Sequence, residues 1–156
     1  MMRMKALAAA VIALTLLGCT GNKVKIIPPD LEIVQLSGPG DQNYPAGEIE
    51  VQYGVRIANR SSEPIVLKQI QLTGIGQGGP YRLKSETYFF NRSIKPDGFE
   101  DVAFWAKAVA TGDAFSIDAQ APVNVRGIAF FNSPSGSFRK VFTKTFNQSG
   151  GSNAPR

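Results

Sequence analysis

Apolar and polar residues alternate along much of the chain, as they do in strands that bury one face. Between residues 48 and 59, every second residue is large and apolar, and the residues between them are polar or small. The apolar members are Ile49, Val51, Tyr53, Val55 and Ile57. This period of two predicts a half-buried β-strand. Glu48 and Glu50 fall on its other face, so we interpret them as solvent-facing carboxylates rather than an acid–base pair.

Similar segments recur at nearly even spacing, separated by breaks rich in Gly, Pro, Asn and Ser. We predict strands at residues 31–36, 48–59, 65–72, 81–90, 99–109, 122–131 and 137–146. Residues 99–109 also fit one face of a helix, but their neighbours favour a strand. The last two segments predict a hairpin closed by residues 132–136. The sequence therefore predicts an all-β fold, a seven-stranded antiparallel immunoglobulin-like β-sandwich that spans residues 30–146.

The start of the chain differs from the rest. Arg3 and Lys5 precede an apolar run at residues 6–17. A short positive head followed by such a run is typical of an export signal. The run is too short to cross a bilayer, which needs about 20 residues. It ends in Leu16-Leu17-Gly18-Cys19, which resembles the lipobox of bacterial lipoproteins.

The lipobox resemblance implies that residues 1–18 are a cleaved signal peptide and that Cys19 is lipidated, with palmitate among its acyl chains. Each buried CH₂ contributes about 0.8 kcal/mol, so several acyl chains on one residue anchor a protein stably. Thr20 rather than Asp follows the cysteine, which in such lipoproteins implies passage to the outer membrane. We therefore expect a bacterial cell-envelope protein, held in the outer membrane by its lipid and facing the periplasm.

The segments that flank the strands predict no packed structure. Residues 19–29 are polar at first and end in two prolines, which indicates a tether. Residues 147–156 are rich in Gly, Ser and Asn, which predicts a disordered tail. The chain has a single Cys, so no disulfide forms within it.

The composition argues against most chemistry. The chain contains no His, the side chain most used for acid–base catalysis and for binding transition metals. We expect no catalytic residue, no metal and no cofactor. Loss of Arg3 and Lys5 on processing leaves 15 basic and 12 acidic residues. This modest positive charge does not indicate a nucleic-acid partner.

Three short motifs match known sites but occur in the wrong context. Residues 74–79 fit a dinucleotide-binding pattern, yet an extended segment follows them instead of a helix. Residues 126–133 partly match an RNA-recognition octet that lacks its stacking aromatics. Ser137 and Lys140 have the spacing of acylating serine enzymes, but three residues along a strand their side chains point to opposite faces. We interpret all three motifs as strands and loops.

Adjacent aromatic residues are the strongest candidates for a function. Neighbours on a strand point to opposite faces, so residues 88–90, 104–105 and 130–131 each place a ring away from the core. Outward rings that converge would form an exposed patch of the kind that marks a binding surface. As a possible interaction surface we predict Tyr88, Phe90, Trp105 and Phe130.

One part of the domain is similar to a known family. Residues 57–65 (IANRSSEPI) and the apolar residues 70–72 resemble the strand–turn–strand of late-embryogenesis-abundant type 2 domains. The match departs from the family at Arg60, where the family has proline. The resemblance implies a similar β-sandwich and assigns no site residues.

Three functions follow from these observations. The favoured one is a non-catalytic interaction or assembly module, tethered to the membrane through the lipid on Cys19 and bound to an envelope protein partner. The alternative is a β-sandwich that binds a small ligand or a lipid in an apolar groove. An envelope hydrolase is the third, and the missing His and nucleophile constellation disfavour it.

Overall fold

The computed structural model describes residues 26–38, 48–76, 79–110 and 122–147. Within these ranges eight strands form two antiparallel four-stranded sheets, and no residue is helical. The strands are β1 (Asp30–Ser37), β2 (Glu48–Ala58), β3 (Ile65–Ile75), β4 (Tyr81–Leu83), β5 (Glu86–Ile94), β6 (Phe99–Ala110), β7 (Val123–Ser133) and β8 (Gly136–Phe146). The predicted all-β class is confirmed. No helix that could cross a membrane occurs in the described ranges.

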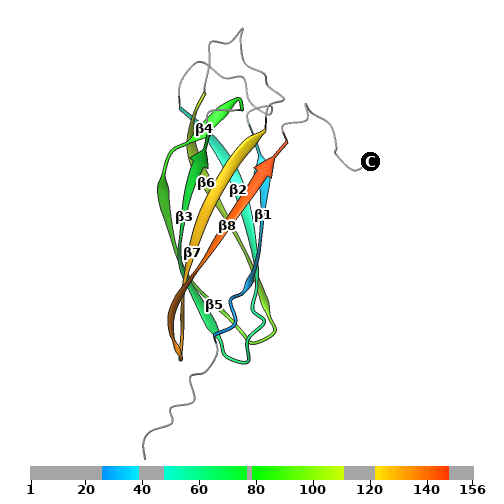
Figure 1. Ribbon diagram of the computed structural model, residues 1–156, viewed down its shortest axis with the longest axis vertical. Coiled ribbons are helices and arrows are strands. Elements are labelled where there is room, and N and C mark those ends of the chain that lie inside the picture. Colours follow the sequence, from blue (N-terminus) through cyan, green and yellow to red (C-terminus); the bar gives the residue numbers. More distant parts are fainter. Residues whose placement is uncertain (1–25, 39–47, 77–78, 111–121, 148–156) are drawn as a thin grey trace, which may run out of the picture.

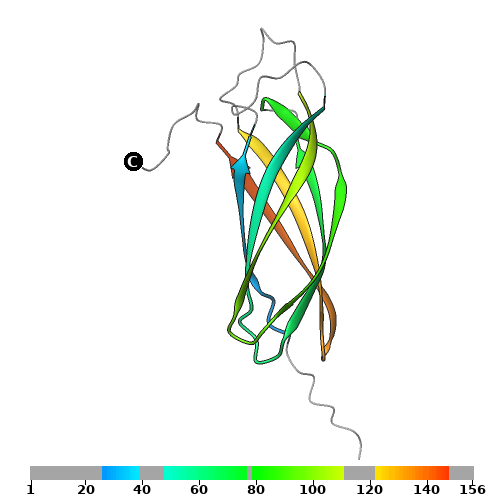
Figure 2. The same ribbon diagram turned by 180° about the vertical axis from the view of Figure 1, so that it is seen from behind.

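The two sheets lie face to face, and their strands follow the long axis of the molecule (Figures 1 and 2). One sheet has the order β1-β2-β6-β4, and the other has the order β5-β3-β7-β8. In Figure 1 the sheet with β3, β7 and β8 lies in front, and in Figure 2, seen from behind, the sheet with β2 and β6 lies in front. The described chain starts at the lower end of the sandwich, and β8 finishes at the upper end. Each sheet therefore buries one face and exposes the other.

β2 and β6 form the centre of the first sheet. They pair along their whole length, with Tyr53 opposite Phe104 near the middle. The alternation predicted for β2 is present, because its apolar positions are buried while Glu48 and Glu50 are exposed. Residues 99–109, whose pattern also fits a helix, lie in strand β6, as predicted. Its pairing with β2 satisfies backbone groups that a helix would satisfy internally.

The prediction of seven strands is wrong by one. Residues 81–90, expected as a single strand, form β4 and β5, which belong to different sheets. Tyr81 and Leu83 are buried beside β6, after which the chain crosses over and β5 pairs with β3. The crossing occurs at Lys84 and Ser85, which are neither Gly nor Pro. The sequence therefore carries no turn signal at this point.

Aromatic rings fill much of the space between the sheets. Tyr53 lies 5.4 Å from Phe146 between ring centroids, and Phe131 stacks on Phe138 at 5.3 Å. Gly127 makes room for a further ring, because a Cβ atom there would lie 2.0 Å from the ring of Phe142. The core is therefore shared by both sheets and closely packed.

Asn59 joins two turns at the lower end of the sandwich. Its side chain is fully buried and donates to the carbonyl oxygens of Glu63, Ile94 and Lys95 over 2.8–3.2 Å. Its Oδ1 accepts from the backbone N–H and the hydroxyl of Ser61. A buried amide that is satisfied in this way fixes the turn between β2 and β3.

Candidate interaction surfaces

The four aromatic residues predicted as one surface do not lie together. Tyr88 and Phe90 turn inward from β5 and pack on Phe104, with ring centroids 4.3 and 5.9 Å from it. Trp105 and Phe130 turn outward, but they stand on different sheets. The outward ring of β5 is Phe89 instead, which is 77% exposed. The sandwich therefore presents two separate surfaces.

The first surface, here called the Trp105 face, consists of the outward side chains of β1, β2 and β6. Val34, Leu36 and Trp105 are 42%, 53% and 47% exposed. Val34 pairs with Gly54, which pairs in turn with Ala103, and Trp105 comes two residues after Ala103. A Cβ on Gly54 would lie 3.2–3.3 Å from methyl groups of Leu36 and Val34. These residues form an apolar strip across three strands, with the small residues Gly54 and Ala103 at its middle.

Charged residues on the Trp105 face form pairs on both sides of this strip. Arg56 donates from Nε and from Nη2 to the two carboxylate oxygens of Asp101, each over 2.9 Å. Its guanidinium group also lies 5.3 Å from the ring centroid of Phe99. The two hydrogen bonds lower the pKa of Asp101 and raise that of Arg56. This bidentate geometry fixes the orientation of both side chains.

Two further carboxylates of the Trp105 face lie beside lysines. Glu50 is directly opposite Lys107 in the register of β2 and β6. Glu48 accepts a hydrogen bond from Lys84, and this contact lowers its pKa. The apolar strip is thus bordered by charges of both signs.

The second surface, here called the Phe89 face, consists of the outward side chains of β5, β3, β7 and β8. One row across it runs from Phe89 through Gln69 and Phe130 to Arg139. Its outward positions hold no carboxylate anywhere along these four described strands. Arg126 and Arg139 are exposed and have no ion-pair partner among the described residues. This surface is basic, and it also carries outward apolar side chains, since Ile128 lies directly opposite Val141, which is 44% exposed.

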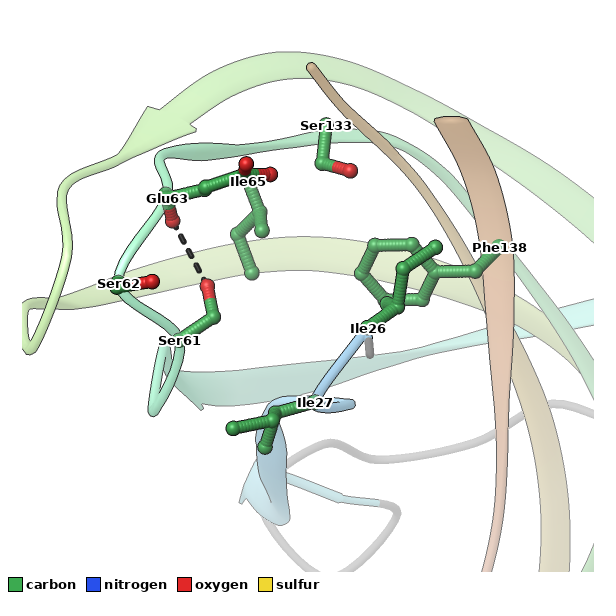
Figure 3. A pocket seen from close by; sticks show the side chains of 8 residues that line it. All are labelled: Ile26, Ile27, Ser61, Ser62, Glu63, Ile65, Ser133 and Phe138. Atoms are coloured by element: carbon green, nitrogen blue, oxygen red, sulfur yellow. Dashed lines mark hydrogen bonds between the residues drawn. The ribbon is translucent and has the colours of Figure 1, made fainter. Parts of the chain in front are cut away.

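A small pocket lies at the lower end of the sandwich, where the described chain begins (Figure 3). Its apolar walls are Ile26, Ile27, Ile65 and Phe138, and polar residues of the turn after β2 and of the end of β7 complete it. Its volume of about 40 Å³ holds a few water molecules. A pocket of this size does not accommodate a lipid or a drug-sized ligand.

The buried hydroxyl groups form a structural chain. Tyr81 donates to Gln35 over 2.9 Å, and Tyr53 lies 3.0 Å from Tyr81, so Tyr53 donates to Tyr81. Burial raises the pKa of Tyr53 and that of Tyr88. The hydroxyl chain therefore links β1, β2 and β4 within one sheet. A phenol that stays protonated inside the core is a poor proton acceptor.

The remaining sequence motifs have the positions that their strands give them. Gly74 is in β3, and the extended strand β4 rather than a helix follows the glycine-rich segment. Ser137 pairs with Asn132 and Lys140 with the buried Ala129, so the two side chains point to opposite faces of β8. The predicted lipidation site, Cys19, lies outside the described residues.

No protein-family model matches the sequence, and no curated protein matches it. Among solved structures, the fold is similar to that of a Bordetella pertussis protein provisionally named ApaA, with a TM-score of 0.52 and 14% identity over 79% of this chain and 97% of that one. An Archaeoglobus fulgidus protein matches with a TM-score of 0.50 and 10% identity over 76% and 94% of the two chains. The structural genomics target SoR45 matches with a TM-score of 0.50 and 13% identity over 82% and 92%. At these identities the similarity concerns the fold alone.

Proposed function

We propose that this chain is a lipid-anchored protein of the bacterial cell envelope, and that its domain is a non-catalytic interaction module. The observation that carries the proposal is the exposed apolar strip of Val34, Leu36 and Trp105 on one sheet face. Contiguous apolar side chains in contact with water mark binding surfaces. The lipobox-like residues 16–19 supply the anchor, and the outer membrane is its destination.

The order of the strands supports an immunoglobulin-like description of the domain. The sheet β1-β2-β6-β4 has the arrangement of strands A, B, E and D in a constant-type domain, and β3-β7-β8 has that of C, F and G. These seven strands also follow one another in the matching chain order. β5 is an addition beside β3, inserted between the equivalents of strands D and E.

The chemistry of the Trp105 face suits recognition of a protein. Trp and Arg are the residues most enriched among those that dominate binding energy, and Trp105 and Arg56 stand on this face. Arg56 is already paired with Asp101 within the chain. A partner that covers this pair therefore does not leave either of its charges unpaired.

The anchor is tested by mass spectrometry of the protein extracted from bacterial membranes. We expect a mature N-terminus at Cys19 that carries acyl chains. A Cys19→Ser variant should keep its first residues and lose the modification. An unmodified Cys19 in the membrane-bound protein would contradict this part of the proposal.

The interaction role is tested by photo-crosslinking in cells that produce the full chain. A photoreactive amino acid at position 36 should give a defined adduct, because Leu36 lies in the apolar strip. The same amino acid at position 89 is the matched control on the opposite sheet. Trp105→Ala should weaken binding by about 1–3 kcal/mol and leave the domain folded. Equal adducts at both positions, or none at position 36, would argue against the Trp105 face.

A further inference from the structure

The outward residues of β6 form a pattern that reverses about Phe104. Asp101 and Lys107 lie three residues on either side of this point and carry opposite charges. Ala103 and Trp105 lie one residue on either side of Phe104, and one of them is small whereas the other is large. A half-turn about an axis through the centre therefore brings each residue onto one with the complementary property.

The neighbouring strand β2 has the same antisymmetry about Tyr53, the register partner of Phe104. Arg56 and Glu50 lie three residues on either side of it with opposite charges. Gly54 and Gln52 lie one residue on either side, again a small residue and a larger one. Both strands thus share one centre, and the antisymmetry belongs to the central pair of strands, β2 and β6.

We propose that the Trp105 face binds a second copy of this chain in a two-fold symmetric contact. The two-fold axis lies between the copies and across the strands, at the row of Tyr53 and Phe104. This inference rests on the proposed interaction function and names its partner. Arg56 then faces the partner's Glu50, Asp101 faces the partner's Lys107, and Trp105 covers the partner's Ala103. In an isologous contact each of these pairs occurs twice.

The apolar strip selects the antiparallel arrangement of the two copies. A two-fold axis along the strands, between β2 and β6, would also oppose unlike charges, because Arg56 would face the partner's Asp101 and Glu50 the partner's Lys107. It would place β1 with Val34 and Leu36 beyond the partner's β6, so the apolar strips would not meet. The antiparallel arrangement opposes unlike charges and also places Val34 over the partner's Leu36, so the apolar strips coincide.

The size of the Trp105 face agrees with a weak dimer. Three strands about 4.8 Å apart and 8, 11 and 12 residues long cover roughly 15 by 34 Å. Two such faces bury about 1,000 Å² in total, the lower limit for a specific interface. The Phe89 face does not offer this contact to itself, because its outward charges are all positive.

Trp105 is the only tryptophan of the chain, so its fluorescence reports on the contact directly. The full chain in detergent micelles should show emission that shifts to the blue as its concentration rises, because the partner's surface removes the indole from water. Phe89→Ser should keep the shift, and Lys107→Glu should abolish it. Emission that does not change between the dilute and the concentrated protein would overturn the proposal.

A charge exchange tests the predicted pairing. Two differently tagged copies of the full chain are produced in one cell, and co-purification is measured. Lys107→Glu in both copies opposes two carboxylates, and Asp101→Lys in both copies opposes two ammonium groups. Each combination should reduce co-purification about tenfold. One Lys107→Glu copy with one Asp101→Lys copy restores opposite charges at both contacts, and co-purification should recover.

The recovery in the mixed pair also shows that both variants fold. Mixed pairs that remain as weak as the single-variant pairs would overturn the two-fold arrangement. Failure of this inference is distinct from failure of the proposed function. A photo-crosslinked adduct at position 36 whose mass is not that of two copies would keep the interaction role and exclude the second copy as partner.

Discussion

The two outer faces of the sandwich differ in how their charges are arranged. On the Trp105 face, Arg56 is held by Asp101, and Glu50 stands opposite Lys107. On the Phe89 face, Arg126 and Arg139 stand among amides, hydroxyls and rings, and the outward positions of its described strands hold no carboxylate. Charges of both signs, one pair of them bidentate, border an apolar strip on one face, and charges of one sign are spread over the other.

Under the proposed function, the Trp105 face is the binding surface and the Phe89 face stays in contact with water. Charges that are already paired cost less to bury, because they retain a partner when water leaves. Unpaired arginines keep their hydration and repel a second basic surface. β8 also ends its sheet and carries Arg139, Lys140 and Lys144, a way of protecting an edge strand from unwanted pairing. The exposure of a single ring, such as Phe89, therefore does not by itself indicate a binding surface, and the charges around the ring must be considered with it.

Neighbouring aromatics of β6 give the largest expected contrast. Phe104→Ala should lower the free energy of unfolding by about 3–5 kcal/mol, because its ring is 8% exposed and contacts three other rings. Trp105 points into solvent in the isolated domain, so Trp105→Ala should lower the free energy of unfolding far less. Chemical denaturation of both variants measures the difference. Equal losses would mean that Trp105 belongs to the core.

Two glycines, one on each sheet, give the next contrast. Gly127→Ala should destabilise the domain by about 1–3 kcal/mol, because the ring of Phe142 occupies the place of the new methyl group. Gly54→Ala meets methyl groups of Leu36 and Val34 at 3.2–3.3 Å on the exposed Trp105 face, where a shift of a few tenths of an ångström is enough, and should cost less than about 1 kcal/mol. Thermal melts distinguish the two. A stable Gly127→Ala variant would show that β8 does not pack over this glycine.

The sequence predicted the strands and the faces of β2 because its alternation is clean. It predicted β5 less well, since Tyr88, Phe89 and Phe90 are three aromatic residues in a row, and the pattern does not say which of them face the core. The inward pair is set by Phe104, which belongs to another strand. No local signal in the sequence carries that contact.

The apolar strip lay beyond sequence reasoning for a related reason. Leu36 and Trp105 are almost 70 residues apart in the chain, and they share a strip because β1 and β6 both pair with β2. Alternation says that a residue faces outward, and only the register between strands says which outward residues are neighbours. Trp105 was identified from its aromatic neighbour, whereas Val34 and Leu36 were missed.

A smaller contrast lies within the Phe89 face. Phe130 is half-buried between Gln69 and Arg139, so Phe130→Ala should cost about 1–2 kcal/mol of stability. Phe89→Ala should stay within about 0.5 kcal/mol, because 77% of Phe89 is exposed. Urea denaturation of the two variants provides the measurement. A larger loss of stability for Phe89→Ala than for Phe130→Ala would mean that Phe89, and not Phe130, is the more buried ring.

The smallest expected effect is a pH dependence confined to the Trp105 face. Arg56 lowers the pKa of Asp101 in the folded protein, so this pair stabilises the fold above the ordinary Asp pKa of about 3.9 and ceases to do so as the pH falls through the lower, folded value. Both side chains are more than half exposed, so the change in stability is slight.

Carboxyl-carbon NMR measures this titration. The midpoint of Asp101 should lie below the ordinary Asp pKa of about 3.9, and Arg56→Gln should return the midpoint toward that value. The amide signals of β7 and β8 on the Phe89 face should not follow this titration, because no carboxylate stands at their outward positions. An Asp101 midpoint at or above the ordinary value would mean that its carboxylate is not paired in solution, and the charge contrast between the two faces would be lost.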